Sequence, residues 1–386
     1  MPGSKISYLW EDAKASRDFV SGVSLHSHTN QSRESLDFLA NFGNQFPVMR
    51  PVLAGAERLW QRKYGFAIDY KRSYWTPPLT PRMAFILESR QIEELGLASL
   101  VSITDHDNIQ APMLLRTVAS ARHIPVSVEW TVPFRGDQAF HLGIHNLPSG
   151  TGAAWMRTFM DFTSNSSDTL LTELLCALHA MPNVLIVFNH PMWDLYLIGE
   201  QRHALRVDEF LQQNRSFLHA LELNGLRNWK ENRAVRQLAR RWSKLLISGG
   251  DRHGVEPNAN INLTMASSFT DFVHEIRYEG TSNLLFLPQY AEPWKHRILQ
   301  STVDALRNYP NFPLGSRRWD ERVYHPDFHG VVQPLRALWP MGEIPFPIRC
   351  ILEIVRTMGS RTISGLSMAR GESEQMRYVL GEQGPA

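Results

Sequence analysis

Seven short runs of β-type apolar residues recur along the chain, and each of them ends in polar or ionisable side chains. They occupy residues 22–28, 99–107, 124–130, 138–146, 184–191, 218–225 and 244–253. Between them lie segments with apolar residues at three- and four-residue spacing, such as 83–97, 169–181 and 231–245. This spacing is typical of amphipathic helices. Strands that alternate with helices predict βα units around a parallel sheet or barrel.

The polar strand ends suggest where a functional site would lie. In a β/α barrel the carboxyl ends of all strands meet at one mouth, so residues far apart in sequence converge there. The candidates are His26, His28, Asp105, His106, Asp107, Glu129, His141, His190, Glu222, Asp251 and His253. For any single strand the plainer interpretation is a hydrogen-bonded loop residue. Seven polar ends in succession favour an active site.

Histidines mixed with carboxylates are the ligands expected of zinc, manganese or iron. Side chains two residues apart in a strand point to the same side, so the imidazoles of His26 and His28 could bind one ion together. The only cysteines, Cys176 and Cys350, lie in helical segments, so neither a thiolate zinc site nor a disulfide is expected. The number of candidate ligands predicts a site for more than one metal ion.

Six short motifs resemble those of the polymerase and histidinol phosphatase (PHP) family of metal-dependent phosphoesterases. In the family's order they are LHSH, ITDHD, VEW, FHLGIHN, NHP and GGDRH, and they fall within residues 22–254. The resemblance implies an α/β fold, namely a deformed seven-stranded (β/α)7 TIM-like barrel. It also implies two or three divalent metal ions, with Mn, Zn or Fe as the candidates.

The same resemblance implies which residues bind each ion. The first ion would have the ligands His26, His28, Glu129 and Asp251. Glu129 would bridge to a second ion held by His141 and His190, and a third ion would involve His106 and His253. The family pattern places an aspartate or histidine where this chain has Arg33. The adjacent Glu34 is the candidate replacement, so occupancy of the third site depends on it.

The implied reaction is hydrolysis of a phosphoester by a hydroxide that bridges two metal ions. His106 or His253 would be the general acid for the leaving alkoxide. Asp105 would serve catalysis as a carboxylate that orients neighbouring histidines. For Glu222, an orienting role and an ordinary strand-end carboxylate both stay open.

Charge and composition narrow the substrate class. The formal net charge of +2, without a long Lys/Arg run, argues against extended nucleic acid or an anionic membrane as a partner. We expect a small phosphomonoester, such as a nucleotide or sugar phosphate, with Arg135 and Arg227 as candidate phosphate-binding residues or plain surface arginines. The alternatives are a nuclease or phosphodiesterase that acts on short oligonucleotides, and a non-catalytic metal-binding regulatory module.

The chain is expected to have a catalytic barrel with two additions. The barrel would cover residues 1–300 with an inserted segment at 41–80, and residues 301–386 would form a mostly helical extension and tail. The insertion leaves directly after the strand of His26 and His28, so we expect a lid over the mouth, the alternative being a flank or oligomer contact. The N-terminus has no apolar signal core, which predicts a cytoplasmic enzyme. The oligomeric state stays open.

Overall fold

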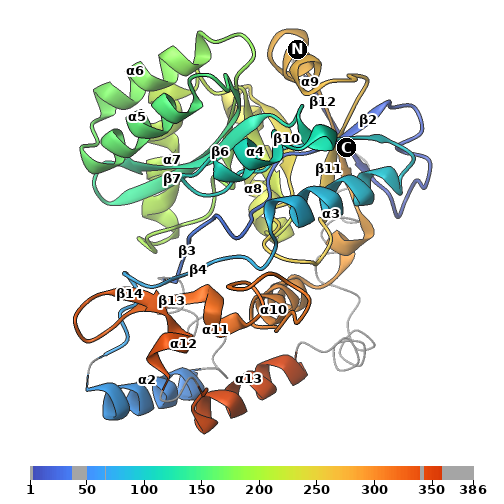
Figure 1. Ribbon diagram of the computed structural model, residues 1–386. Coiled ribbons are helices and arrows are strands. Elements are labelled where there is room, and N and C mark those ends of the chain that lie inside the picture. The colour runs from blue at the N-terminus through green and yellow to red at the C-terminus, as the bar shows by residue number, and fades with distance from the viewer. Residues whose placement is uncertain (1–2, 37–49, 66, 340–342, 359–386) are drawn as a thin grey trace.

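The computed structural model describes residues 3–36, 50–65, 67–339 and 343–358 (Figure 1). Within these ranges the chain folds into three β-sheets with surrounding helices, so the predicted α/β class is confirmed. Two five-stranded sheets form the larger body of the molecule. A four-stranded sheet with its own helices forms a separate layer below them in Figure 1.

All seven predicted runs contain strands. These are β2 (Ser21–Ser24), β5 (Ala98–Val101), β6 (Val126–Phe134), β7 (Gln138–Leu147), β8 (Leu185–Asn189), β9 (Ala220–Asn224) and β10 (Leu245–Gly249). Strands β2 and β5 end before their polar residues, so His26, His28 and Asp105 lie just beyond the strand ends. The two large sheets contain three more strands that were not predicted, namely β1 (Gly3–Tyr8), β11 (Asn260–Thr264) and β12 (Thr281–Phe286).

The two large sheets differ in strand direction. One has the order β10-β9-β8-β7-β6, in which β10, β9 and β8 are parallel and β7 is antiparallel to both of its neighbours. The other has the order β1-β12-β11-β2-β5, in which β11 is antiparallel to both of its neighbours. Strand β11 therefore occupies the place beside β2 that a regular barrel would give to β10.

Within the described ranges only isolated bridges and side chains connect the two large sheets. Ser27 pairs with Arg252, and His106 pairs with Glu129. Asn262 on β11 accepts a hydrogen bond from the Ser248 amide at 2.8 Å and donates one to the Ser248 carbonyl at 2.9 Å. The hydrogen bonds between these strands therefore do not form the closed barrel that was expected. The observed arrangement is two sheets joined at their edges, because β11 separates β2 from β10.

Apolar side chains between the two large sheets hold them together. Val23 from β2, Val187 from β8 and Ile247 from β10 are buried in one cluster, to which α9 (Phe269–His274) adds Phe269 and Phe272. Burial of each such side chain stabilises the fold by about 1.5–3 kcal/mol. This packing fixes the strands, and the strands in turn fix the residues at their ends.

Helices cover the outer faces of both sheets. The long helices on the larger body are α3 (Pro81–Glu93), α5 (Gly152–Ser164), α6 (Asp168–His179), α7 (Glu200–Asn214) and α8 (Trp229–Trp242). Helices α3, α6 and α8 confirm the three predicted segments, and each has an N-cap side chain that accepts from a backbone amide, namely Thr80, Ser167 and Asn228. Shorter helical pieces are α4 (Gln110–Leu115), Ala119–Ala121, Glu275–Glu279 and Pro288–Ala291.

The third sheet and five helices form a layer that we call the cap. Its strands are β3 (Glu34–Ser35), β4 (Tyr74–Trp75), β13 (Val323–Pro326) and β14 (Val332–Pro334), in the order β14-β13-β4-β3. Its helices are α2 (Arg50–Tyr64), α10 (Trp294–Ala305), α11 (Trp319–Arg322), α12 (Leu335–Leu338) and α13 (Phe346–Met358). Trp60, Trp319, Trp339 and Leu352 form its buried core.

The cap joins two segments that the sequence analysis treated separately. Tyr74 and Trp75, from the 41–80 insertion, pair with Tyr324 and Val323 of the C-terminal segment. The Tyr74 and Tyr324 rings stack at a centroid distance of 4.6 Å. Insertion and extension therefore form one folded unit, although residues 37–49 and 359–386 lie outside the described part of the chain. No helix in the described ranges is both long and apolar enough to cross a membrane.

Candidate metal centre

The first two histidines are positioned by backbone pairing beyond the ends of β2 and β10. The Asp251 amide donates to the His26 carbonyl at 2.8 Å, and the His28 amide donates to the Arg252 carbonyl at 2.8 Å. This pairing brings the Nε2 atoms of His26 and His28 within 3.0 Å of each other. Both imidazoles are buried and converge on one point, as alternation in the sequence predicted.

Glu129 lies at the centre of the cluster, on β6, with a fully buried side chain. Its Oε2 lies 3.0 Å from His26 Nε2, 3.3 Å from His28 Nε2 and 3.3 Å from His106 Nδ1. Its Oε1 lies 3.1 Å from the Nε2 of His190 and 3.4 Å from the Nδ1 of His141. One carboxylate thus faces histidines from four different strands. His26, His28, His106 and His190 lie just beyond strand ends, whereas His141 lies inside β7 and not at its end as predicted, because β7 runs antiparallel to its neighbours.

Asp251 closes the cluster on the side of β10. Its Oδ1 lies 3.6 Å from His26 Nε2 and 3.5 Å from His28 Nε2. The backbone of Asp251 has a φ of 56°, in the left-handed region that residues other than glycine adopt rarely, and His190 has a φ of 26°. Such conformations persist where the surrounding structure requires them, often at functional sites.

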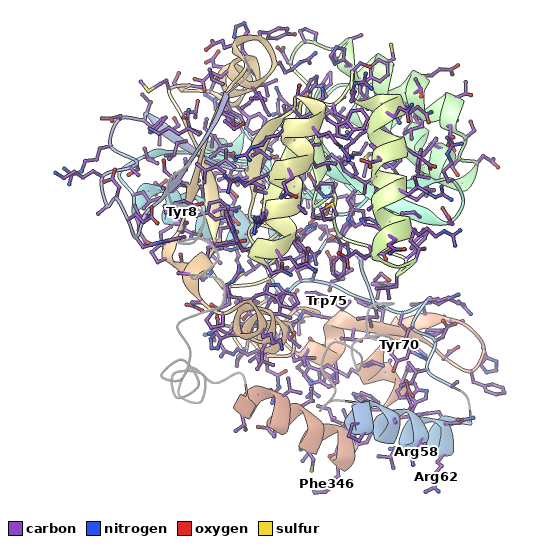
Figure 2. All side chains as sticks on the ribbon, turned by 180° about the vertical axis from the view of Figure 1, so that it is seen from behind. Tyr8, Arg58, Arg62, Tyr70, Trp75 and Phe346 are labelled. Carbon is purple, nitrogen blue, oxygen red and sulfur yellow. The ribbon has the colours of Figure 1, made fainter. Side chains whose placement is uncertain are left out.

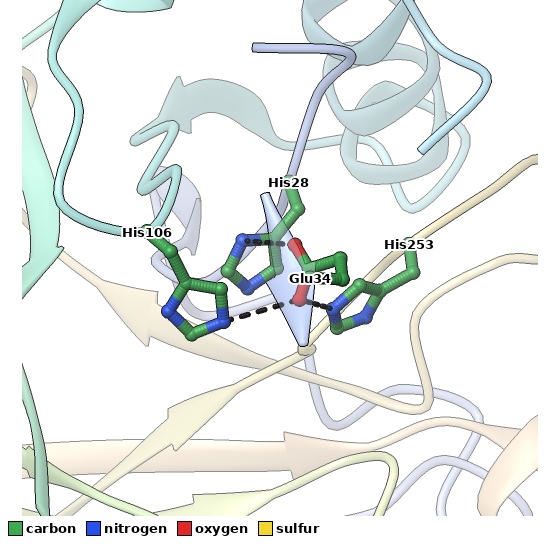
Figure 3. Close-up of side chains that lie close together, drawn as sticks. All are labelled: His28, Glu34, His106 and His253. Atoms are coloured by element: carbon green, nitrogen blue, oxygen red, sulfur yellow. Dashed lines mark ion pairs between the residues drawn. The ribbon is translucent and has the colours of Figure 1, made fainter. Parts of the chain in front are cut away.

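Glu34 gathers a further group of histidines, which Figure 3 shows in close-up. Its Oε2 lies 3.2 Å from the Nε2 of His106 and 3.2 Å from the Nε2 of His253, and its Oε1 lies 3.5 Å from His28 Nδ1. Arg33 does not join them, because its guanidinium lies over the Tyr74 ring of the cap. The structure thus brings Glu34, and not Arg33, to the predicted third site.

These residues fit divalent metal ions. Four overlapping sets have ligand atoms within 4.8 Å of one another: His28–Glu34–His106–His253, His26–Glu129–His190, His26–His28–Asp251 and His106–Glu129–His141. The Nδ1 atoms of His106 and His141 are buried, and neither has a hydrogen-bond partner among the described residues. Imidazole nitrogens and carboxylates without thiolates suit zinc, manganese or iron.

The electrostatics of the cluster favour positive charge. Burial alone would raise the pKa of Glu129, but the nearby His26, His106 and His141 hold it well below its usual range. Burial would likewise lower the pKa of His28, yet Glu34, Asp251 and Glu129 raise it to about 10. Carboxylates that stabilise protonated imidazoles so strongly would stabilise bound cations in the same place.

Outer residues orient these ligands. Glu222 Oε1 lies 2.6 Å from His26 Nδ1, which leaves Nε2 of that ring for a metal ion, and its Oε2 accepts from the His190 amide at 2.8 Å. The sequence left open whether Glu222 orients a ligand or is an ordinary strand-end carboxylate, and these contacts favour the orienting role. Its carboxylate lies against Gly249, where an added Cβ would come within 1.6 Å of Oε1. Only glycine leaves room for this contact.

Asn189 and Asn224 belong to the same outer layer, and the sequence analysis did not select them. Asn189 Nδ2 donates to Glu129 Oε1 at 2.9 Å, and Asn224 Nδ2 donates to Asp251 Oδ2 at 3.1 Å. Both asparagines sit at strand ends, in the motifs FNHP and ALELNG, which is the signal that could have found them.

Asp105 contacts the loop that follows His28 and not the histidines themselves. Its Oδ1 accepts from the Thr29 amide at 2.5 Å and its Oδ2 from the Thr29 hydroxyl at 2.7 Å. Burial raises the pKa of Asp105 to about 6, although His28 and these hydrogen bonds oppose the rise. Asp107 similarly accepts from the Thr131 amide at 2.8 Å. Both carboxylates hold backbone segments that carry ligands.

The two candidate substrate-binding arginines lie in different surroundings. Arg227 lies near the cluster, with Nη2 3.9 Å from Asp251 Oδ2 and its guanidinium 3.7 Å from the centre of the Trp193 ring. Arg135 is half exposed and forms an ion pair with Asp168 at 2.6 Å. The structure thus brings Arg227, but not Arg135, into contact with a candidate ligand.

The cap reaches the cluster through Trp75, whose ring centroid lies 5.8 Å from that of His253. Figure 2 shows Trp75 at the boundary between the larger body and the cap, and Tyr70 within the cap. Tyr70 donates to Glu57 at 2.9 Å, and Arg72 donates to the Gly330 carbonyl at 2.5 Å. Among the described aromatic residues of the expected lid, Trp75 is the one with a ring contact to a candidate ligand.

Comparison with known proteins assigns no family. No family model matches the chain, and no curated protein matches it. An amidohydrolase structure from Chromobacterium violaceum, with bound sulfate and no metal, is 14% identical, covers 46% of this chain and 84% of its own, and has a TM-score of 0.33. A candidate metal-dependent phosphoesterase from Bifidobacterium adolescentis is 16% identical, with 52% and 91% covered and a TM-score of 0.31. Likenesses this weak assign no activity.

Proposed function

We propose that the protein is a metal-dependent hydrolase of small phosphomonoesters, with the PHP-type chemistry that its motifs imply. The observation that carries this proposal is the position of Glu129. Its Oε1 lies 3.1 Å from His190 and its Oε2 lies 3.0 Å from His26, so the two oxygens face different ligand groups. A carboxylate in this position can bridge two metal ions, the arrangement used in two-metal phosphoester hydrolysis.

Two divalent ions in this site would neutralise phosphate oxygens and lower the pKa of a bound water. The residues of the chain prepare the site for them. Glu222 fixes the His26 ring with Nε2 turned inward, and Asn224 holds the Asp251 carboxylate. Because these partners are buried, the ligands are held in place before a substrate arrives.

Arg227 is the proposed phosphate-binding residue. Stacking on Trp193 fixes the plane of its guanidinium beside Asp251. Its Nε is buried and has no hydrogen-bond partner in the described part of the chain. This donor is available to a substrate oxygen, and arginine forms strong charge-assisted hydrogen bonds with phosphate.

The role of His253 depends on the number of ions. His106 and His253 both lie 3.2 Å from Glu34, so an ion bound by Glu34 would have both as ligands. With two ions bound elsewhere, His253 is free to protonate the leaving alkoxide. With three ions, His253 is a ligand, and the proton must come from water.

The fold that we propose for this chemistry is a deformed barrel. The bridges Ser27–Arg252 and His106–Glu129 join the two large sheets beside the candidate ligands. Six of the seven predicted strands, all except the antiparallel β7, would then turn their carboxyl ends toward one site, and β1, β11 and β12 would be additions between β2 and β10. Convergence of candidate ligands that lie on six strands or just beyond them supports this arrangement.

The test is hydrolysis by protein loaded with manganese. We expect p-nitrophenyl phosphate to be hydrolysed at least tenfold faster than bis(p-nitrophenyl) phosphate, with loss of activity on chelation and recovery on metal addition.

A single turnover in oxygen-18 water should place the label on phosphate, since no covalent intermediate is needed. Arg227→Ala should lower kcat/KM by roughly 10- to 100-fold, as expected for a hydrogen bond to a charged group. Arg135→Ala is the matched control.

Three outcomes would contradict the proposal. Faster hydrolysis of the diester would indicate a phosphodiesterase or nuclease. Metal-loaded protein without turnover on any phosphoester would indicate a regulatory module. A trapped phosphoenzyme would contradict direct attack by water.

A further inference from the structure

A pocket of about 400 Å³ adjoins the metal centre and shares Asp251 and His253 with it. It lies between the loop that follows β10, residues 250–259, and helix α10 of the cap. None of the roles assigned above to the metal centre uses it. Its size suits a small organic group, since ligand pockets in proteins have volumes of about 300–1,000 Å³.

The far wall of the pocket is held rigidly against the larger body. Arg297 on α10 is buried and donates to the carbonyls of Gly225 and, at 3.2 Å, Arg227. Asp304, one turn of helix from the pocket residue Ser301, accepts from the Val255 amide. Gly254 leaves room for this contact, because an added Cβ would lie 1.9 Å from Asp304 Oδ2. The pocket is thus part of the folded interface between cap and body.

Three polar atoms of the lining residues are buried and lack a hydrogen-bond partner anywhere in the described ranges. Gln289 Oε1 and Asn258 Oδ1 are acceptors, and Arg297 Nε is a donor. Asn258 and Arg297 are 2% and 8% exposed, so bulk water does not readily supply the missing partners. Buried polar atoms without partners are costly, which points to a ligand or ordered water in this pocket.

We propose that the pocket binds the leaving group of the substrate and that this group carries several hydroxyls, as in a sugar or polyol phosphate. The inference rests on the proposed phosphomonoester hydrolysis at the adjoining metal centre. A hydroxyl both donates and accepts, so neighbouring hydroxyls can satisfy Gln289, Asn258 and Arg297 together. Ser301 and Gln300 offer further groups of the same dual character.

Other ligand classes match the pocket less well. A second phosphate accepts hydrogen bonds, so it could pair with Arg297 Nε but not with the two unpartnered acceptors. An ammonium group only donates, so it would leave Arg297 Nε without an acceptor. A nucleobase would favour an aromatic face for stacking, and the described lining contains no Phe, Tyr or Trp side chain.

The test compares sorbitol 6-phosphate with p-nitrophenyl phosphate, whose leaving group lacks these hydroxyls. With manganese-loaded protein, we expect kcat/KM to be at least tenfold higher for sorbitol 6-phosphate. Gln289→Leu should raise KM for sorbitol 6-phosphate about five- to tenfold, as expected for one lost hydrogen bond, with a smaller change in kcat. Its effect on p-nitrophenyl phosphate should be smaller, because that leaving group has no hydroxyl to make this bond. Gln300→Leu is a second pocket variant, and Gln201→Leu, an exposed glutamine on α7, is the matched control.

A binding measurement separates this inference from the proposed function. Saturation-transfer NMR on metal-free protein should detect sorbitol and should lose the signal in Gln289→Leu but not in Gln201→Leu. Hydrolysis of p-nitrophenyl phosphate as fast as sorbitol 6-phosphate, with no effect of either pocket variant, would overturn the inference and leave the proposed function intact. Sorbitol binding without hydrolysis of any phosphomonoester would overturn the proposed function and keep the pocket assignment.

Discussion

The two large sheets and the cap both supply side chains to the candidate metal centre, but they do so by different routes. The sheets contribute Glu129 from within β6, and His190 and Asp251 from just beyond β8 and β10. The cap contributes Glu34, which pairs with Trp75 in a sheet whose next strand comes from residues 323–326. A candidate ligand thus depends on contacts between segments about 250 residues apart.

The candidate ligands therefore differ in what holds them in place. Ligands on the large sheets rest on local strand packing and on buried partners such as Glu222 and Asn189. Glu34 rests on whether the cap is folded and seated. We therefore expect the Glu129 groups to tolerate damage to the cap, and the Glu34 group to respond to it.

The largest expected effect comes from Glu129→Gln, which removes charge from the carboxylate shared by several histidines. We expect loss of more than one metal equivalent per chain, measured by elemental analysis of protein purified without chelator. Activity should fall by more than about 100-fold, because even outer-shell partners change affinity or activity about 10- to 100-fold. Glu173→Gln, an exposed glutamate on α6, is the control. If wild-type protein purified in the same way contains no metal, the proposed difference between the ligands of the large sheets and of the cap is wrong.

The second expected effect comes from a matched pair of tryptophans. Trp60→Ala removes a ring from the cap core, where Trp60 packs on Tyr64 and His325, and Trp130→Ala removes a ring stacked on Phe159 in the larger body. Each should cost about 3–5 kcal/mol of unfolding free energy. Trp60→Ala should reduce only the metal bound by Glu34, whereas Trp130→Ala should also disturb the adjacent Glu129. Equal metal loss in both variants would show that cap and body do not differ in this way.

Local sequence patterns predicted seven strands of the larger body well and the cap poorly, for physical reasons. Alternation and apolar runs reflect burial of a strand's own side chains, so the seven strands could be found without their partners. Strand β11 escaped prediction because it buries Asn260 and Asn262, whose side chains hydrogen-bond to the backbone of β9 and β10. A buried asparagine looks like a turn residue until its partner is known.

The cap sheet has even less local signal. Strands β3 and β4 are two residues long, and their pairing with β13 crosses most of the chain. The motif comparison placed the family residue at Arg33 and offered Glu34 as its replacement, and the pairing of Glu34 with Trp75 brings the Glu34 carboxylate to His253. The closed barrel was also expected from the motifs, which carry no information about where β11 inserts.

A smaller effect is expected from Glu34→Gln, with Arg33→Ala as the adjacent control. Glu34→Gln should weaken the binding of one metal equivalent by about 10- to 100-fold and leave the others bound, as measured by competition with a metal chelator. Arg33→Ala should leave all equivalents in place, because its side chain lies over Tyr74. Loss of every equivalent in Glu34→Gln would instead show that cap and body form a single cooperative site.

The smallest expected effect concerns pH and uses one histidine from each region, both outside the metal centre. His219 Nδ1 accepts from the Ile186 amide at 2.8 Å, and burial, with Arg277 and His179, lowers its pKa to about 2. In the cap, His325 Nε2 accepts from the Asp69 amide at 3.0 Å, and burial again lowers its pKa. Both rings must stay neutral to accept these hydrogen bonds.

The sign of the effect follows from proton linkage. Above pH 6.5 the ring is neutral in both the folded and the unfolded chain, so it adds no pH dependence. Below pH 6.5 the unfolded chain binds a proton that the folded chain excludes, so stability falls as the pH falls. For His219 this amounts to about 2 kcal/mol between pH 8 and 5. Unfolding by urea at both pH values should show a smaller pH-dependent loss in His219→Gln than in wild type, and a separate, smaller change in His325→Gln. Identical pH slopes in wild type and His219→Gln would show that this ring titrates in the folded protein as it does in the unfolded chain.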